Sequence, residues 1–191
     1  AAPLWDQVEY KNLRFSSGPW VKTPYKGAPT PAIDEAWNAI VPLYLIRIPA
    51  AAIPHLNKSA TAATFPGSSD YLGTVDAFHQ LHCVNLVRKY TYADYYKDID
   101  IAWRDPPDML RTHVDHCIDV LRQKIMCDAD VSVITYSWVE GREHVLPDFS
   151  NTHRCRNFDK VRDWVLENKM DMGSREITKS KEAVSVPTEA L

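Results

Sequence analysis

The sequence lacks the features that mark several large classes of protein. No apolar run is long enough to cross a bilayer, and no signal peptide is present. Lysine and arginine do not gather into a basic stripe, and the net charge is only −3 with histidine neutral, which argues against nucleic acid as a partner. The chain begins Ala-Ala-Pro without a methionine. We therefore expect a fragment without its N-terminal leader or anchor.

Signatures of the common redox cofactors are also missing. The sequence has no GxGxxG for a flavin or nicotinamide and no evident haem-thiolate signature. It has no CxxC-like pair, which a zinc protein would be expected to show. If the protein carries out redox chemistry, the centre has to be built from other side chains.

What the sequence does contain is a short internal duplication. Residues 79–83 read HQLHC and residues 113–117 read HVDHC, at an offset of 34. The likeness continues at the same offset, where residues 84–88 match residues 118–122. The two copies hold four of the seven histidines and two of the four cysteines. Such self-similarity indicates two matched segments, each with two imidazoles and a thiol.

The spacing within each copy places its ligand-type side chains on one face of a helix. Residues three and four apart are neighbours on a helix surface, so His79 pairs with His82, and His113 with His116. Each cysteine falls on the same stripe. Two such helices packed face to face would direct four imidazoles into one small volume, as in metal sites of helix bundles. A single HxxH is more often ordinary surface or core, but two matched copies favour a metal site.

The residue pattern as a whole predicts a mainly α domain with two antiparallel HxxHC helices and a few short strands. Thr30 before Pro31 and Asp105 before two prolines are helix-start signals. We expect helices over about 31–42, 74–96 and 106–126 with a last one after 153–156, strands over 43–48 and 131–139, and loops over 49–69 and 147–151. The domain then covers 31–169, between an extended arm at 1–30 and a disordered tail at 170–191.

The four cysteines allow two disulfides. Cys117 and Cys127 would lie roughly 15 Å apart on one helix, too far to pair. This leaves either Cys83–Cys117 with Cys127–Cys155, or Cys83–Cys127 with Cys117–Cys155. Asn57 begins an Asn-Lys-Ser glycosylation pattern. Together these features favour a secretory compartment.

Four further residues near the motifs or in loops need a separate interpretation. His153 lies two residues before Cys155, so a Cys127–Cys155 bridge would hold it over the helices as a further ligand. His55 is expected to be a solvated loop residue and His144 an exposed one. Asp115 should point away from the stripe that His113 and His116 share.

These residues together resemble a known family. The two HxxHC motifs, the segments LRQKIMCDADV at 121–131 and HRCRNFDKVRDW at 153–164, and Asp34-Glu35-Ala36-Trp37 are similar to the DUF3328 or UstYa-like proteins of fungal biosynthetic gene clusters. The resemblance covers roughly residues 30–165. It implies oxidative tailoring of peptides and other natural products by cyclisation, desaturation, hydroxylation or halogenation.

The resemblance also implies a location and a ligand set. Family members are usually anchored by one N-terminal transmembrane helix facing the secretory lumen, so we expect an ER or Golgi location and membrane contact only through that missing anchor. Copper, as one or two ions, is expected on His79, His82, His113, His116 and His153. We further predict that both disulfides form and that Cys127–Cys155 is one of them, each contributing about 2–4 kcal/mol. We also expect a homo- or heterodimer.

Copper suits this ligand set, because imidazole binds it well and it heads the divalent affinity series. We expect O₂ activation followed by hydrogen-atom abstraction from the substrate. Three alternatives remain open at this point. One is non-haem iron held partly by His113 and Asp115, one is a hydrolytic or structural zinc protein, and one is a non-catalytic partner whose histidines bind metal for stability.

Overall fold

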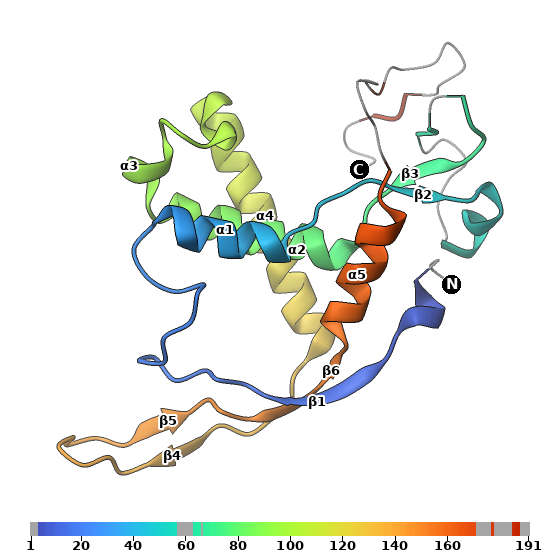
Figure 1. The fold of residues 1–191 in the computed structure, drawn as a ribbon. Helices are drawn as coiled ribbons and strands as arrows, with labels where there is room; N and C mark the ends of the chain where they lie inside the picture. The colour runs from blue at the N-terminus through green and yellow to red at the C-terminus, as the bar shows by residue number, and fades with distance from the viewer. Residues whose placement is uncertain (1–3, 57–62, 66, 171–176, 178–184, 188–191) are drawn as a thin grey trace. The chain divides into compact units, whose positions relative to one another are not determined.

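The computed structural model describes residues 4–56, 63–65, 67–170, 177 and 185–187. They form two compact units (Figure 1). The first unit takes in the described parts of 1–9, 42–76 and 157–191, and the second takes in 10–41 and 77–156. No helix among the described residues is long and apolar enough to cross a membrane.

The first unit is built from short elements around one small sheet. Strands β2 (Ile46–Ile48) and β3 (Tyr71–Gly73) pair antiparallel, with Ile46 opposite Gly73. The helical elements are η1 (Trp5–Gln7), η2 (Ala50–Ala52), η3 (Pro54–Leu56) and α5 (Phe158–Asn168). Lys160 on α5 forms an ion pair with Glu9 at 2.6 Å, and the buried Val165 is the inner residue of this helix.

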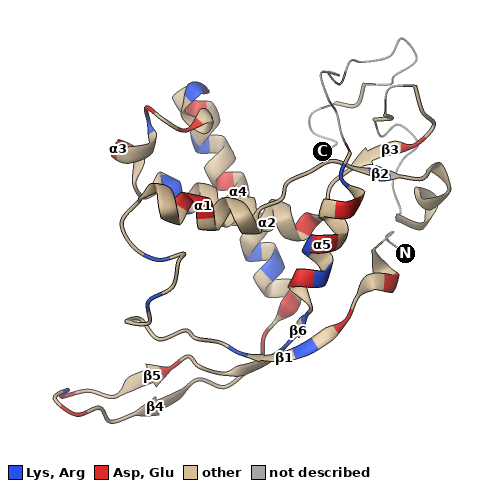
Figure 2. Cartoon of the chain, viewed as in Figure 1, with Lys and Arg blue, Asp and Glu red and all other residues tan. Residues whose placement is uncertain are grey.

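The second unit carries both HxxHC motifs. Its helices are α1 (Pro31–Ile40), α2 (Asp76–Tyr90, of which Asp76 belongs to the first unit), α3 (Ala93–Tyr96), η4 (Ile101–Arg104) and α4 (Pro107–Asp128). Its strands form two antiparallel pairs, β1 (Tyr10–Arg14) with β6 (Thr152–Arg156) and β4 (Thr135–Ser137) with β5 (Leu146–Asp148). Along α4 acidic and basic side chains are interspersed, as Figure 2 shows.

Local sequence signals explain where the main helices begin. Thr30 caps α1, since its Oγ1 accepts the Ile33 N–H at 3.3 Å and Pro31 follows in the first turn. The predicted start at Thr30 is thus confirmed. For α4 the predicted Asp105 cap is wrong: the helix begins at Pro107 with Pro106 as N-cap and no side-chain cap. A proline in the first turn is tolerated because its missing N–H would have no helical partner there.

A part-buried polar network joins α1, α2 and α3. The Arg88 guanidinium on α2 lies 2.6 Å from a carboxylate oxygen of Asp34 on α1. The Tyr96 hydroxyl donates to the same oxygen at 2.7 Å and accepts from Arg88 at 2.9 Å. Burial raises the pKa of Tyr96 to about 12, and its hydrogen bond to Asp34 also raises this pKa. The neighbouring Arg88 lowers it, but by less. The network fixes α1 against the helix that carries the first motif.

The apolar core of the second unit lies between the two motif helices. It contains Leu86 from α2, Leu110 and Val114 from α4, and the two motif cysteines. Trp103 and Leu121 pack against its edge. The buried stripe on each helix is therefore the one that runs past the histidines, as the 3.6-residue periodicity predicts.

The observed elements correct several expectations. The described residues are partly helical with three small antiparallel sheets, rather than mainly α. The helix expected over 74–96 is broken into α2 and α3 by a turn at residues 91–92. Only Thr135–Ser137 of the expected 131–139 strand pairs, and its partner β5 ends inside the expected 147–151 loop. Residues 10–14 of the expected arm are paired as β1.

Candidate functional site

The two HxxHC motifs meet where α2 and α4 cross obliquely (Figure 1). Both motifs are helical throughout, which confirms the predicted helical setting. Cys83 and Cys117 are fully buried in the shared core below the crossing. Because each cysteine lies one turn from the first histidine of its motif, burying the cysteines sets the rotation of both helices and brings the histidines to the edge of the interface.

Four imidazole rings face one another at this edge. The ring centroids of His79 and His116 are 5.6 Å apart, and so are those of His82 and His113. Within each motif the two rings are 6.5 Å apart. The first histidine of each motif thus faces the second of the other, which is the antiparallel pairing that the duplication predicts. We call these four residues the histidine cluster.

The environment of His82 favours neutral imidazole. Burial lowers the pKa of His82, and the charges that His113 and His79 would carry lower it further. His79, His82 and His113 are half-buried, whereas His116 is exposed. Neutral imidazole is the ligating form.

The structure corrects the predicted disulfides. No two of the four cysteines, all of which the structure describes, are joined by a disulfide, so the expected disulfide-stabilised fold is not found. Cys127 is exposed in the last turn of α4, and Cys155 is half-buried on β6. The other two form a hydrogen-bonded thiol pair in which burial raises the pKa of Cys117 to about 12, with the bond to Cys83 acting in the same direction. A protonated thiol is a poor ligand, because the thiolate is the form that binds metal.

The chemistry of the donors fits copper, whose preference for imidazole is strong. The four rings come from two facing helices, and the pairs that face one another are the closer ones. Among the residues that the structure describes, no three His, Cys, Asp or Glu side chains are positioned to hold one ion together. The donor set is therefore brought together by the fold, without forming a preassembled coordination sphere.

His153 is not brought to the histidine cluster. Its Nδ1 lies 2.8 Å from Asp130, which follows the end of α4. His116 and Asp128 are separated by twelve residues of that helix, or roughly 18 Å along its axis. The expected tether is also absent, since Cys127 and Cys155 are not bonded.

The remaining candidates lie away from the cluster. Asp115 is exposed and paired with Arg111 on the outer face of α4, as its helical position predicts. His55 on η3 and His144 near the turn between β4 and β5 are both exposed, as expected. Asn57 lies outside the described residues.

Sequence reasoning missed the polar residues that hold α1 against α2, the helix that carries the first motif. Arg88, five residues beyond Cys83 on α2, bonds to Asp34, which is 54 residues away in the sequence, and to Tyr96, which is 8 residues away. Asp34 was visible only as part of the DEAW segment, and nothing in its local pattern pointed to Arg88. A long-range ion pair leaves no periodic signal.

Comparison with known proteins supports a single family. Residues 1–168 match the family model described as mycotoxin biosynthesis protein UstYa. The UstYa family oxidase phomYc of Diaporthe leptostromiformis is 41% identical over 153 residues, which cover 76% of this chain and 59% of phomYc. The related phomYc' of the same fungus is 37% identical over 169 residues, covering 87% of this chain and 60% of phomYc'.

A third relative comes from another fungus. The UstYa family oxidase aprY of Aspergillus flavus is 39% identical over 111 residues, covering 56% of this chain and 33% of aprY. The chain thus spans at most about 60% of the length of these relatives. No solved structure matches.

Proposed function

Because the chain belongs to the UstYa family, we propose that it is the copper-dependent oxidative domain of an enzyme that tailors a fungal peptide or other natural product. The observation that carries the proposal is the facing of His79 with His116 and of His82 with His113. The relatives' names as oxidases supply the class of reaction.

In this proposal the histidine cluster holds one or two copper ions. Two ions would be shared between the helices, one by each facing pair. Bound copper would supply the one-electron chemistry with O₂ that oxidation of an unactivated C–H bond requires. The outcome at the substrate is cyclisation, desaturation, hydroxylation or halogenation.

The chain's own residues contribute position and electrostatics. The buried thiols and core leucines fix both helices, so that opposing imidazoles keep their facing arrangement. The Arg88–Asp34 pair holds α1 against α2, the helix that carries His79 and His82. Half-burial of His82 disfavours its protonated form, which keeps a nitrogen lone pair available for the metal.

The alternative metal, non-haem iron, has less support. A two-histidine, one-carboxylate site would use Asp115, but that carboxylate is paired with Arg111 on the outer face of α4. A zinc protein and a metal-stabilised, non-catalytic partner remain alternatives, because either would use the same imidazoles without redox turnover.

The proposal extends to the whole protein. O₂ and a peptide or other natural product are its substrates, and the full-length protein acts in the lumen of the ER or Golgi through a membrane anchor. A homo- or heterodimer belongs to the same proposal. All of these rest on the family resemblance.

The experiment that tests the function is metal-dependent turnover. The protein, produced without a histidine tag, is loaded separately with copper, iron(II) or zinc and mixed with candidate peptides under O₂ and under argon. We expect a mass change of the peptide only with copper and O₂. Turnover with iron alone, or the same mass change under argon, would overturn the proposal.

A further inference from the structure

A series of aromatic side chains in contact leads from α2 through the second unit. The ring centroids of Tyr90 on α2 and Trp103 on η4 are 6.4 Å apart, and those of Trp103 and Tyr96 on α3 are 6.1 Å apart. Tyr95 continues the series, because its ring centroid is 4.9 Å from that of Tyr96. Successive contacts therefore join four rings, which we call the aromatic chain: Tyr90, Trp103, Tyr96 and Tyr95.

The aromatic chain begins at the end of the α2–α4 contact that carries His82 and His113. Tyr90 follows His82 on α2 by about two helical turns, roughly 12 Å along the axis. The guanidinium of Arg111 lies over the Tyr90 ring, and Arg111 precedes His113 by two residues on α4. Tyr90 and Trp103 both pack against the apolar core between the motif helices. The near end of the chain is therefore close to the facing pair His82–His113.

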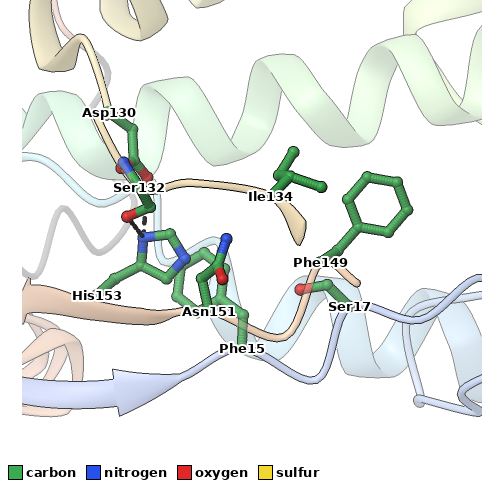
Figure 3. A pocket seen from close by; sticks show the side chains of 8 residues that line it. All are labelled: Phe15, Ser17, Asp130, Ser132, Ile134, Phe149, Asn151 and His153. Atoms are coloured by element: carbon green, nitrogen blue, oxygen red, sulfur yellow. Dashed lines mark hydrogen bonds and ion pairs between the residues drawn. The ribbon is translucent and has the colours of Figure 1, made fainter. Parts of the chain in front are cut away.

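The far end of the aromatic chain reaches the protein surface. Tyr96 is 1% exposed, whereas Tyr95 is 38% exposed. Contact between rings has no redox meaning by itself, since packed aromatic side chains commonly show such separations. Phe15 and His153, which line the pocket in Figure 3, are closer at 3.8 Å, yet neither side chain gives up an electron readily. The aromatic chain differs because every member is tyrosine or tryptophan, the aromatic side chains that lose one electron most easily.

Tyr96 is the member whose surroundings suit one-electron chemistry. Its hydroxyl donates to Asp34 Oδ1 at 2.7 Å, so the phenol proton already points at a carboxylate oxygen. A phenol that loses an electron becomes a strong acid and must release its proton, and this carboxylate can accept it without movement of either side chain. Arg88 donates to the Tyr96 oxygen at 2.9 Å, and this hydrogen bond can remain when the oxygen has lost its proton.

We propose that the aromatic chain carries single electrons from the protein surface toward the histidine cluster, with Tyr96 as a redox-active tyrosine. Trp103 first loses one electron toward the cluster across Tyr90. Tyr96 then gives one electron to the oxidised Trp103 and its hydroxyl proton to Asp34. A one-electron reductant of the ascorbate class, itself oxidised to its radical, returns an electron to Tyr96 across the exposed Tyr95 ring, and the proton returns from Asp34 to the Tyr96 oxygen.

The net result is one electron moved from the reductant to an oxidant, with the aromatic chain and Asp34 restored. That the oxidant arises at the histidine cluster, from oxygen chemistry there, rests on the proposed function. The redox activity of Tyr96 does not, because it depends only on the ring contacts and on the hydrogen bond to Asp34. The two parts are therefore tested separately.

The first test generates an oxidant beside the aromatic chain in metal-free protein. The exposed Met109 lies next to Leu110, a residue of the core against which Trp103 packs. Met109→Cys, combined with Cys127→Ser and Cys155→Ser to remove the accessible thiols, takes a ruthenium tris(bipyridine) complex. A laser flash with persulfate as electron acceptor turns this complex into a one-electron oxidant, and electron paramagnetic resonance detects the protein radical that follows.

We expect a tyrosyl signal that is lost in Tyr96→Phe and unchanged in Tyr92→Phe, an exposed neighbour outside the aromatic chain. Trp103→Phe should reduce the yield of this signal by more than half, because phenylalanine does not pass the electron on. A signal of the same size and shape in Tyr96→Phe would overturn the assignment of Tyr96. A full yield in Trp103→Phe would overturn the path.

Asp34→Asn tests the proton acceptor. Its amide cannot take the phenol proton, so transient absorption should show tyrosyl formation roughly a hundredfold slower, at the lower end of what a positioned base contributes. Asp34→Glu keeps a carboxylate and should recover most of the rate. Asp94→Asn, in an exposed pair with Lys97, is the matched control and should form the radical at the wild-type rate. Wild-type kinetics in Asp34→Asn would overturn the role of Asp34 as the acceptor.

The second test links the aromatic chain to the histidine cluster. Copper-loaded wild type and Trp103→Phe, matched for copper content, are treated with hydrogen peroxide and ascorbate, and peptide mass spectrometry measures oxidation of the four cluster histidines. We expect several times more oxidation in Trp103→Phe, because electrons from the surface no longer reach the cluster. Equal oxidation in the two proteins would overturn the link. A protein that binds no copper would contradict the proposed function, while the photochemical result would still decide the redox activity of Tyr96.

Discussion

His79 lies opposite His116, with 5.6 Å between the ring centroids, and the equivalent pair His82 and His113 has the same separation. The equality shows that the duplication in sequence is also a near two-fold relationship in space. It relates the two helices at their crossing, so each facing pair contains one histidine from each motif. A metal shared by a facing pair would link α2 to α4.

Copper should therefore stabilise the fold. At a free copper concentration of 100 times the dissociation constant, one site adds about 2.7 kcal/mol to the free energy of unfolding. Differential scanning calorimetry of metal-free and copper-loaded protein measures this as a rise in Tm. The double variant His79→Ala/His116→Ala should lose at least half of the rise, and His55→Ala/His144→Ala should keep all of it. A full rise in the first variant would contradict a shared ion.

The Arg88–Asp34 pair should be important for stability. Asp34→Asn leaves the guanidinium without its carboxylate in a part-buried site and should lower the free energy of unfolding by about 3 kcal/mol. Asp94→Asn is the control, because that side chain is fully exposed in its pair with Lys97 and should cause no measurable change. Urea denaturation compares the two variants. If Asp34→Asn were as stable as Asp94→Asn, the Arg88–Asp34 pair would not contribute measurably to the free energy of unfolding.

Tyr96 should titrate apart from the other tyrosines. Its pKa of about 12 in the folded state exceeds the ordinary value of 10, so its contribution to stability is complete below pH 10 and is lost as the pH rises toward 12. Absorbance titration of the phenolates should show one late-titrating group among nine tyrosines. That group should be missing in Tyr96→Phe, and its persistence there would refute the assignment.

The thiols should differ sharply in reactivity. Cys127 is exposed and should be alkylated first in the native protein, with the half-buried Cys155 following. Cys83 and Cys117 should react only after unfolding, because both are buried. Peptide mapping after timed alkylation measures the order. If the two buried cysteines resisted alkylation in denaturant without a reductant, they would be bonded and not free.

The sequence predicts those parts of the structure that depend on the spacing of nearby residues along the chain. The HxxHC spacing predicted the helices and the shared face, and Thr30-Pro31 predicted the start of α1. The β1–β6 pairing was not predictable, because Leu13 faces His153 across 140 residues and neither strand alternates clearly between apolar and polar positions. The partner of His153 was not predictable for a related reason. Its role was expected from a Cys127–Cys155 bridge and from the family resemblance, whereas in the structure it contacts Asp130, two residues beyond the end of α4.

The most direct test of the copper site is the metal content of single histidine variants. His79→Ala and His113→Ala occupy equivalent positions in the two motifs, so elemental analysis of tag-free protein should show the same loss of copper in both. His153→Ala, at the contact with Asp130 beyond the end of α4, should retain the wild-type copper content. If His79→Ala and His113→Ala both kept wild-type copper, or if His153→Ala alone lost it, the histidine cluster would not be the metal site.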